Sequence, residues 1–442
     1  MPGPQIRPVV SDEDFVDKVD VAIVGGGIVG ACTALELAER GVSVAVFERG
    51  DIAQEQSSRN LGWVRLTNRD PREIPLMIEA LRLWAGMDQR TGQPTGYTRC
   101  GIVFADRTEN DLERRLGWTR NLDGTGFACA PLTTAEVDAF FPGAHFDGVG
   151  GIHSPFDGRA EPQLAAPAII EAARQRGARI YAHCAVTGIE TTAGRVSGVE
   201  TIRGRVAASS VVIAGGAWSR QLCRSVGVDF PQLDLAATVL RTGPIDGPET
   251  SFGTGEYAFR RRLDGGYTVG TFDTRADITP AAFRYAPRFL KAAMSQSVRY
   301  SFGPRYFREL MGAGSAYDSE PALDPRPWFD LRAVIDRVAR EFPFLRGVSM
   351  AQGWGGYLDV TPDELPVIGA VGNVSGLFLS SGYSGHGFGL APGAGRLAAD
   401  LVTGTTPIVD PKPFALSRLV PGSDGPGPSA AADAGGLTPT MN

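Results

Sequence analysis

The sequence predicts an α/β fold, in which a Rossmann-type nucleotide-binding domain is discontinuous along the chain and an α+β substrate domain on a mainly antiparallel sheet is inserted into it. Three observations carry this prediction. Residues 21–48 have the pattern of a strand, a glycine turn, a helix and a second strand that ends in an acid. Strand and helix patterns return over 160–215 and 350–405. The intervening residues 225–335 favour β structure.

The glycine turn indicates a dinucleotide site. Gly25 permits the tight turn, Gly27 lets the backbone approach a pyrophosphate, and Gly30 lets helix and strand pack closely. The helix that begins there directs free N–H groups and a positive dipole end at phosphates. Glu48 lies 18 residues after Gly30, where a carboxylate can accept hydrogen bonds from an adenosine ribose. A glycine-rich structural turn is the alternative, but the complete strand–helix–strand–acid unit favours the dinucleotide.

The expected domains follow from these segments. Residues 1–19 form a polar lead-in, and the Gly-, Pro-, Ala-, Ser- and Asp-rich residues 421–442 are predicted to be a disordered tail. The nucleotide-binding domain comprises 20–95, 150–222 and 340–415, and the substrate domain comprises 96–149 and 223–339.

The composition limits the partners and the compartment. The chain has 442 residues, a net charge of −6 and a pI near 5.5, which argue against nucleic acid or an anionic membrane as a partner. It contains neither an apolar stretch of about 18 residues nor the apolar core of a signal peptide. The five cysteines are scattered without a C-x-x-C pair, and the four histidines lie far apart. We therefore expect a cytoplasmic protein with reduced thiols and no metal site.

Three further segments resemble the D-amino acid oxidase family of flavoproteins, which includes glycine oxidase, sarcosine oxidase and D-amino acid dehydrogenases. The first is QSSRNLGWVR over 56–65, and the second is VVIAGGAWS over 211–219. The third combines 353–369 with the glycine-rich loop 381–393. The resemblance extends from residue 20 to residue 405, with the segments in the expected order. It implies FAD as the cofactor and the oxidation of an amine or amino acid as the activity.

FAD-binding residues are expected in all of these segments. Hydroxyls and N–H groups of the serine pair can bind the pyrophosphate, and the helix opened by the loop 381–393 would stabilise negative charge on the flavin. Trp218 could instead be an ordinary core aromatic residue, and His386 a loop histidine that contributes only a backbone contact. The expected FAD-binding residues are Gly25, Gly27, Ile28, Val29, Gly30, Glu48, Arg49, Ser57, Ser58, Arg59, Asn60, Leu61, Gly62, Trp63, Val186, Ala214, Gly215, Trp218, Gly353, Gly382, Ser384, Gly385, His386, Gly387 and Phe388.

The candidates for the catalytic site carry a charge, a hydroxyl or an aromatic ring. By the resemblance, Arg65 matches a flavin-side arginine, and Asn68 stands where a carboxylate-binding arginine would be. We therefore expect an arginine of the run 260–262 to bind a substrate carboxylate. A solvated charge run on a hairpin is the alternative. The six candidates are Arg65, Tyr257, Arg260, Thr268, Tyr357 and His386.

Two departures from the family pattern bear on the flavin linkage and the electron acceptor. Gly356 stands where sarcosine oxidases attach the flavin through a cysteine, so noncovalent FAD is expected. Thr268 stands where sarcosine oxidase has a lysine beside the flavin, and a positive charge there favours reaction with oxygen. Because glycine oxidase also lacks this lysine, the acceptor is either oxygen or a dye or quinone-type molecule, with a preference for the second.

The predicted activity is FAD-dependent oxidation of an amino acid or secondary amine. Hydride transfer to flavin N5 would give an imine, which water hydrolyses. One alternative is an FAD-binding subunit of a heteromeric amine dehydrogenase. Another is a different flavin enzyme such as a monooxygenase, which would need a nicotinamide site beside the single dinucleotide fingerprint. The identity and chirality of the substrate and the oligomeric state stay open.

Overall fold

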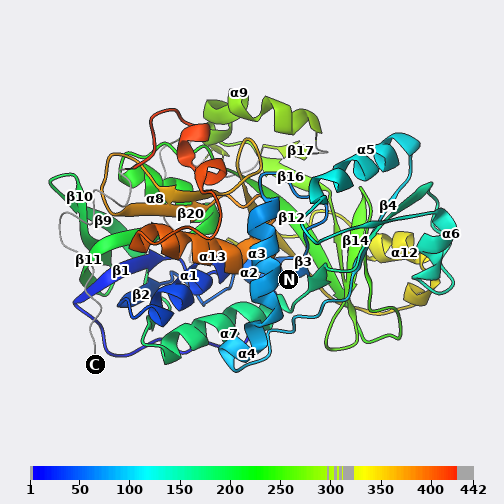
Figure 1. Ribbon diagram of the computed structural model, residues 1–442, viewed down its shortest axis with the longest axis horizontal. Coiled ribbons are helices and arrows are strands. Elements are labelled where there is room, and N and C mark those ends of the chain that lie inside the picture. The colour runs from blue at the N-terminus through cyan, green and yellow to red at the C-terminus, as the bar shows by residue number, and fades with distance from the viewer. Residues whose placement is uncertain (1–2, 296–297, 303–305, 308–310, 312–322, 426–442) are drawn as a thin grey trace.

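The computed structural model describes residues 3–295, 298–302, 306–307, 311 and 323–425. It has two lobes, each built on one large β-sheet (Figure 1). The first lobe contains the nucleotide-binding segments, and the second contains most of the predicted substrate domain. The expected fold class is confirmed.

A largely parallel sheet forms the core of the first lobe. Its order is β19-β20-β11-β1-β2-β8, and the strands from β20 to β8 run parallel to one another. β2 and β20 are buried along their whole length, which is usual for strands covered on both faces. Antiparallel β10 pairs with β11, and β9 pairs with β10. The bounds are β1 (Lys18–Val24), β2 (Val44–Phe47), β8 (Arg179–Tyr181), β9 (Val186–Thr192), β10 (Arg195–Thr201), β11 (Gly204–Ile213), β19 (Val367–Ala370) and β20 (Leu377–Ser381).

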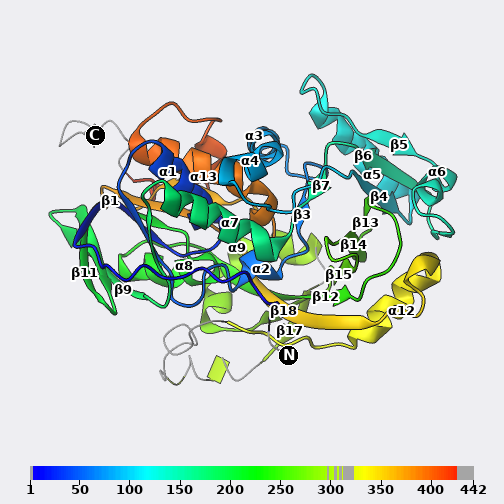
Figure 2. The ribbon, with the colours of Figure 1, turned by 90° about the horizontal axis from the view of Figure 1, so that it is seen from below.

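Helices cover one face of this sheet, and the ribbon of β9 and β10 packs on the other face (Figure 2). α1 is buried from Ile28 to Ala38 because it lies between α7 and α13. Its apolar residues therefore surround the whole helix instead of forming one stripe. The helix bounds are α1 (Ile28–Glu39), α2 (Gln56–Arg59), α3 (Ile74–Ala85), α4 (Met87–Thr91), α7 (Pro162–Gln175), α8 (Ser219–Ser225) and α13 (Gly387–Thr403).

A mainly antiparallel sheet of ten strands forms the second lobe. Its order is β17-β16-β12-β15-β14-β13-β4-β6-β5, and β18 pairs with β12. Aromatic rings such as Phe252, Phe259 and Phe342 fill the space between this sheet and α12. The strand bounds are β4 (Ile102–Asp106), β5 (Ala130–Leu132), β6 (Gly150–Ser154), β12 (Leu233–Thr242), β13 (Ser251–Gly253), β14 (Tyr257–Arg261), β15 (Tyr267–Thr271), β16 (Thr274–Asp277), β17 (Val298–Ser301) and β18 (Met350–Val360). The helices here are α5 (Glu109–Thr119), α6 (Thr134–Ala139), α9 (Pro280–Ser295) and α12 (Leu331–Glu341), and the small sheet between the lobes pairs β3 (Trp63–Val64) with β7 (Gly158–Arg159).

Two strands depart from the expected domain boundaries. β6 and β18 belong to the second sheet, although both were expected in the nucleotide-binding domain. β18 begins beside α12 and extends towards the first lobe (Figure 2). There, Asp359 accepts a hydrogen bond from the Gly382 N–H at 2.8 Å. The apolar pattern identifies such a strand but not the sheet that it joins, because partner choice depends on residues far away in the sequence.

Both ends of the described chain pack on the first lobe. Within the predicted lead-in, the Asp12 N–H donates to the Ile180 carbonyl oxygen at 2.8 Å. At the start of the predicted tail, the Gly372 N–H donates to the Ser423 carbonyl oxygen at 2.7 Å. The disordered tail was therefore placed too early in the chain, and its remaining residues 426–442 lie outside the described residues.

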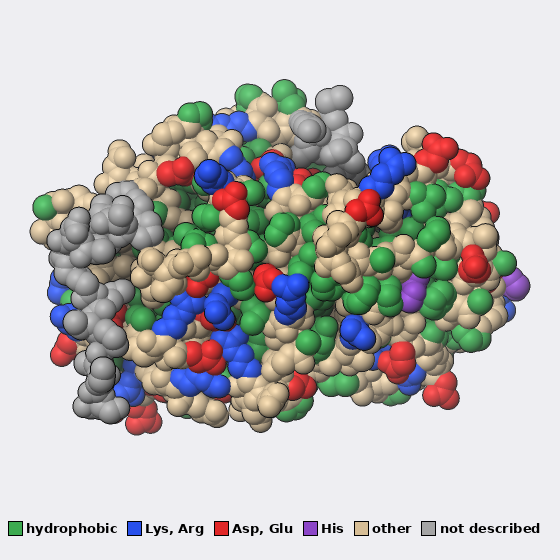
Figure 3. Space-filling model, viewed as in Figure 1, with side chains coloured by type: hydrophobic (Ala, Val, Ile, Leu, Met, Phe, Trp, Pro, Cys, Tyr) green, Lys and Arg blue, Asp and Glu red, His purple; other side chains and the backbone are tan. Residues whose placement is uncertain are grey.

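Figure 3 shows acidic and basic side chains interspersed over one face of the molecule. In the described part of the chain, no helix combines the length and the apolar character needed to cross a membrane. The described residues also bring together no group of three or more His, Cys, Asp or Glu side chains that could hold a metal ion.

Candidate active site

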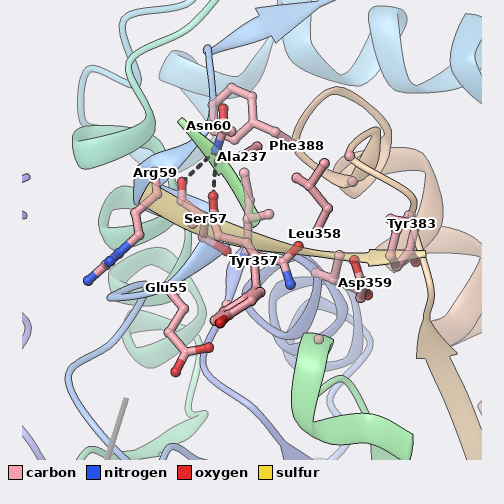
Figure 4. Close-up of a pocket in the computed structure, with 18 of the residues that line it drawn as sticks. Glu55, Ser57, Arg59, Asn60, Ala237, Tyr357, Leu358, Asp359, Tyr383 and Phe388 are labelled. Atoms are coloured by element: carbon pink, nitrogen blue, oxygen red, sulfur yellow. Dashed lines mark hydrogen bonds between the residues drawn. The ribbon is translucent and has the colours of Figure 1, made fainter. Parts of the chain in front are cut away.

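A cavity of about 1240 Å³ lies where the two lobes meet. Sites for single small molecules usually have volumes of about 300–1,000 Å³, so this cavity has room for a dinucleotide together with a substrate. Figure 4 shows side chains of residues 55–60 next to those of β18, with Tyr383 and Phe388 nearby. The predicted site residues that line the cavity are Gly25, Gly27, Ile28, Val29, Glu48, Arg49, Ser57, Arg59, Asn60, Leu61, Gly62, Trp63, Arg65, Val186, Ala214, Gly215, Trp218, Tyr357, Ser384, Gly385, His386, Gly387 and Phe388.

The predicted glycine turn borders the cavity. Gly25 has a φ of +117°, and a Cβ on it would collide with the Ala214 carbonyl oxygen. Residues 27–29 line the cavity where α1 begins without a side-chain cap and without an acid in its first turn. This helix N-terminus is suited to an anion such as a pyrophosphate. Gly30 does not line the cavity, because it packs against the Gly25 carbonyl oxygen.

Glu48 lies directly after β2, next to the glycine turn. Its Oε2 accepts a hydrogen bond from the Gly26 N–H at 2.7 Å, and its Oε1 accepts one from the Gly50 N–H at 2.9 Å. Burial raises the pKa of this carboxyl. The Cys184 N–H donates to the Glu48 carbonyl oxygen at 2.7 Å, which brings Val186 to the same part of the cavity wall. A carboxylate has about four acceptor positions, so acceptor capacity remains for ribose hydroxyls.

The loop around α2 forms the floor of the cavity. Ser57 Oγ accepts a hydrogen bond from the Ile28 N–H at 2.8 Å, so this hydroxyl lies at the N-terminus of α1. Asn60 ties the loop together, because its Oδ1 accepts from the Gly62 N–H at 2.8 Å. Ser58 was expected to contact the cofactor, but it does not line the cavity. It is fully buried, and its hydroxyl lies 3.2 Å from the carbonyl oxygens of residues 54 and 55.

Residues 323–324 lie against the start of this loop. The Glu55 carboxylate accepts hydrogen bonds from the Leu323 N–H at 2.8 Å and from Trp218 Nε1 at 3.1 Å. Burial raises the pKa of Glu55 to about 7. Arg59 forms an ion pair with Asp324 at 2.5 Å. The sequence did not predict Glu55 or Asp324 as site residues, because each is a single acid outside any recognisable motif.

Trp218 is part of the cavity wall and not only a core residue. The guanidinium of Arg49 lies 4.5 Å from the centre of its ring, and both residues line the cavity. Ala214 and Gly215 precede it in the turn that leaves β11, where the Ala214 N–H donates to the Val24 carbonyl oxygen at 2.9 Å. The turns after β1 and β11 therefore border the cavity together, as expected for the carboxyl ends of parallel strands.

The glycine-rich loop before α13 is held by the end of β18. Asp359 Oδ2 accepts hydrogen bonds from the Gly382 N–H at 2.8 Å and from Ser381 Oγ at 3.2 Å, and burial raises the pKa of Asp359 to about 6. Two predicted cofactor-binding glycines in these segments, Gly353 and Gly382, do not line the cavity. A Cβ on Gly353 would collide with Leu331 of α12, so this glycine permits packing within the second lobe. Gly382 has a φ of +78° and faces the side chain of Thr361, so it serves the turn.

Three of the predicted catalytic residues do not line the cavity. The Tyr257 hydroxyl donates to Glu341 at 2.7 Å within the aromatic core of the second lobe. Arg260 is fully buried, and it forms an ion pair with Glu161 at 2.5 Å. Thr268 is also fully buried, and its hydroxyl accepts a hydrogen bond from Arg262. These residues stabilise the second lobe and have no access to a substrate.

Arg260 and Thr268 lie one residue pair away from the pair that lines the cavity on the same face of the hairpin. In β14 and β15, Ala258 pairs with Gly270 and both line the cavity. The next pair on the same face is Arg260 with Thr268, and Leu61 covers it: Arg260 Nε donates to the Leu61 carbonyl oxygen at 2.7 Å. The sequence indicated the correct face of the sheet, but it could not show where the loop 61–62 crosses that face.

The other three predicted catalytic residues line the cavity. The Tyr357 hydroxyl donates to Asp277 at 2.9 Å. Burial, together with the nearby Arg69, lowers the pKa of the Arg65 guanidinium to about 9. Burial lowers the pKa of His386 to about 4, which Arg69 also favours and Glu73 opposes. Arg69 is a further cavity-lining residue that the sequence reasoning missed, since only its distance from Arg65 could have indicated it.

The cavity wall also bears on the mode of flavin attachment. Gly356 lines the cavity, whereas none of the five cysteines, all of which lie in the described residues, does so. Noncovalent binding of the flavin stays a prediction.

Comparison with known proteins identifies the family. The model of the FAD dependent oxidoreductase family matches residues 20–401. The chain belongs to this family. It is 26% identical to a glycine oxidase of Pseudomonas putida over 89% of this chain and 97% of the relative. Its fold is similar to that of an L-amino acid deaminase from Proteus myxofaciens in complex with anthranilate, with a TM-score of 0.88, 30% identity and coverage of 95% of this chain and 99% of that chain. A glycine oxidase structure from Geobacillus kaustophilus has a TM-score of 0.76 and 24% identity over 91% of this chain and 99% of that chain.

The family and the cavity agree on the cofactor. FAD is the cofactor of this protein, which is an FAD-dependent amine or amino acid oxidoreductase. The uncapped N-terminus of α1 fits the pyrophosphate, and the buried carboxylate of Glu48 fits the adenosine ribose. The loop 60–63 and the N-terminal end of α13 form a further part of the cavity wall.

Proposed function

We propose that the protein oxidises α-amino acids and that Arg65 binds the substrate carboxylate. The observation that carries this proposal is a half-buried, cavity-lining cation that forms no ion pair among the described residues. The side chain of Arg65 donates one hydrogen bond, to the Thr67 carbonyl oxygen, and no carboxylate lies within 4 Å of it among the described residues. Burial of an unpaired charge is costly, and it lowers the pKa of this guanidinium. An anionic ligand would remove that cost.

The surroundings of Arg65 suit the carboxylate of an organic substrate. Its guanidinium lies 5.7 Å from the ring of Trp63 and 5.5 Å from the ring of Phe104. Trp63 belongs to the small sheet between the lobes and Phe104 to β4 of the second sheet, so Arg65 lies at the junction of the two lobes. The planar guanidinium can hold a carboxylate by two parallel hydrogen bonds, with apolar rings on its sides.

The comparisons support an amino acid substrate. The relatives include glycine oxidases and an L-amino acid deaminase, and the deaminase structure contains anthranilate, which is an aromatic carboxylate. Bound FAD would supply a hydride acceptor for the carbon that carries a neutral amine, and water would hydrolyse the resulting imine. The protein would contribute orientation, because a bidentate contact at the carboxylate fixes one end of the substrate.

Substitution of Arg65 tests the proposal. We expect Arg65→Gln to lower kcat/KM for amino acids by about 100-fold or more, because truncation of one partner in a buried charge pair costs about 2–5 kcal/mol. The same variant should leave kcat/KM for the corresponding amine without a carboxylate within about threefold, since that substrate has no group for Arg65 to bind. Arg65→Lys should recover part of the loss, because one ammonium replaces a bidentate contact.

The matched control is Arg72→Gln, because Arg72 lies nearby in the chain, is 47% exposed and does not line the cavity. FAD content is measured for each variant. An Arg65→Gln enzyme with wild-type kcat/KM for amino acids would disprove the proposal. Equal losses with amino acids and amines would also disprove it, since they would indicate a general effect on the flavin.

We further propose a dye or quinone-type molecule as the preferred electron acceptor over oxygen. No lysine is present among the described residues that line the cavity. Arg65 would be neutralised by the substrate carboxylate and would then not favour superoxide formation, whereas a proton on His386 would act in the opposite direction. Thr268 does not bear on this choice, because Leu61 covers its strand pair. Stopped-flow reoxidation of the substrate-reduced enzyme decides the question: faster reaction with oxygen than with a dye would overturn the preference.

A further inference from the structure

Three side chains with unsatisfied polar atoms, of which Glu73 and Arg69 are buried and His386 is half-buried, meet at the N-terminal end of α13. Glu73 is fully buried, and neither of its carboxylate oxygens has a hydrogen-bond partner in the protein. His386, the residue before α13, places Nδ1 3.6 Å from Glu73 Oε2. Arg69 places Nη1 4.0 Å from the same oxygen. His386 Nδ1 and Arg69 Nη1 also lack partners, so three groups that are able to hydrogen-bond converge without doing so.

This cluster touches the cavity on one side. Arg69 and His386 line the cavity, whereas Glu73 lies behind them at the start of α3. The His386 side chain is 22% exposed, and the Glu73 side chain is not exposed at all. Glu73 therefore reaches the cofactor site only through the imidazole and the guanidinium.

The charges around His386 nearly balance while its imidazole is neutral. The segment before α3 contributes Arg65, Arg69, Asp70 and its partner Arg72, and α3 begins after Glu73. The buried Asp157 acts on both Arg65 and Arg69. The three arginines offset the three acids, so a proton on the imidazole adds a positive charge without a counter-charge. Further titratable groups on the neighbouring elements are Tyr383 of the glycine-rich loop and Asp359 of β18, which also hold that loop in place, and Asp363, which pairs with Arg72.

We propose that His386 is a redox-linked proton acceptor, which is neutral beside oxidised FAD and takes up one proton from solvent when FAD has been reduced. A hydride carries two electrons and one hydrogen nucleus, so the cofactor gains one negative charge when it accepts the hydride. One proton on the imidazole cancels that charge, and the only bond formed in the protein is an N–H bond. Glu73 only accepts hydrogen bonds, so Nδ1 keeps its hydrogen towards Glu73 and the new proton binds Nε2.

Glu73 and Arg69 are positioning residues in this device. The fixed negative charge of Glu73 supports the imidazolium, and Arg69 offsets Glu73 while the imidazole is neutral. The inference requires FAD in the cavity but is independent of the substrate and of the role of Arg65. Its test can therefore fail while the proposed function stands, and the reverse is also true.

The pH dependence of the flavin midpoint potential tests the proposal, measured on the FAD-loaded protein against a reference dye, without substrate. As the pH is raised from 7 to 9, the wild-type midpoint potential should first fall with the slope expected for two protons taken up per two electrons. Above the pKa of His386 in the reduced protein, it should fall with half that slope. His386→Gln should show the one-proton slope over the whole range. A one-proton slope in the wild type, or an unchanged slope in His386→Gln, overturns the proposal.

Two variants of α3 separate the role of Glu73 from a general effect on the helix. Glu73→Gln removes the charge but keeps the shape, and it should move the change of slope to lower pH by at least about one unit. The matched control is Glu79→Gln, because Glu79 lies on the same helix and pairs with Arg82 on the surface. The control should keep the wild-type pH profile, and equal shifts in both variants would contradict a specific role for Glu73.

A direct measurement applies if His386→Gln does not retain FAD. The imidazole signals of the wild-type protein can be followed by NMR in the oxidised and the reduced states at pH 7. The other three histidines, none of which lines the cavity, serve as internal references. The proposal predicts that one imidazole becomes protonated on reduction. This signal should belong to His386, and the signals of His145, His153 and His183 should not change. An unchanged protonation state of His386 overturns the proposal.

Discussion

Gly27 is the residue at which a single added methyl group would most directly obstruct the cofactor. It lies at the start of α1, lines the cavity, and a Cβ on it would lie 3.0 Å from Ser57 Oγ. The same space is needed by a pyrophosphate that approaches the helix N-terminus. We expect Gly27→Val to abolish FAD retention, measured by flavin absorbance of the purified protein.

The control for this variant is Gly86→Val. Gly86 has a negative φ and an open surrounding, so a side chain there meets nothing within 4 Å. This protein should keep its flavin. Full flavin content in Gly27→Val would show that the pyrophosphate lies elsewhere.

His386 should make the stability of the folded protein depend on pH. Its pKa is about 4 in the folded protein and 6.5 in the unfolded chain. Between these values the unfolded state binds more protons, so the free energy of unfolding falls as the pH falls from 6.5 to 4. The loss from this residue is at most about 3 kcal/mol. Urea unfolding midpoints at pH 7 and pH 4.5 should therefore differ less in His386→Gln than in the wild type, and equal differences would contradict the assignment.

At the level of residues, backbone roles were easier to predict than side-chain contacts. The glycine spacing encodes a turn and a close approach, so Gly25, Gly27 and Glu48 were correctly placed at the cavity from local sequence alone. The contacts of Arg260 and Glu73 depend on loops and helices that are distant in the sequence. A buried acid such as Glu73 leaves no local signal, because its partners are set by tertiary packing.

At the level of elements, the hairpin of β14 and β15 supports the cavity-lining loop 61–62. Arg260 donates to the Leu61 carbonyl oxygen at 2.7 Å and pairs with Glu161 at 2.5 Å. Glu161 also accepts a hydrogen bond from the Leu263 N–H at 3.0 Å. This buried pair therefore connects the second sheet, α7 and the loop 61–62.

We expect Arg260→Met to lower the free energy of unfolding by about 3–5 kcal/mol, because it leaves the Glu161 charge buried and unpaired. Thermal and urea unfolding measure this effect. The control is Arg261→Met, since Arg261 lies next in the strand and pairs with the exposed Glu249, where a loss of about 1 kcal/mol or less is expected. A stable Arg260→Met protein with a raised KM for amino acids would instead support the carboxylate role that the sequence indicated.

The boundaries of elements and their assignment to sheets were predictable to different degrees. The β-α-β unit of β1, α1 and β2 was correct because helix and strand periods differ clearly there. β18 was assigned to the wrong sheet, because a strand that links two lobes has the same apolar pattern as one that ends within a lobe. β18 therefore links the second sheet to the site, because it pairs with β12 along its length and supplies cavity-lining residues at one end.

At the scale of the whole molecule, the cavity is a property of both lobes together. The first lobe supplies the glycine turn, Glu48 and the loop 57–63, which suit FAD. The second lobe supplies the wall around Ala258 and Gly270, and Arg65 lies at the junction. The family relationship makes the use of FAD and the oxidation of an amine or amino acid the established part of this account. The central proposal is that the substrate has a carboxylate.

Anaerobic mixing of the wild-type enzyme with matched substrates tests that proposal most directly. Each α-amino acid is compared with the amine that lacks its carboxylate, and loss of the visible absorbance of the oxidised flavin is followed in a stopped-flow instrument. We predict rapid bleaching by at least one class of α-amino acids and bleaching slower by about 100-fold or more with the corresponding amines. Bleaching by the amines at equal or greater rates than by the amino acids would contradict the account.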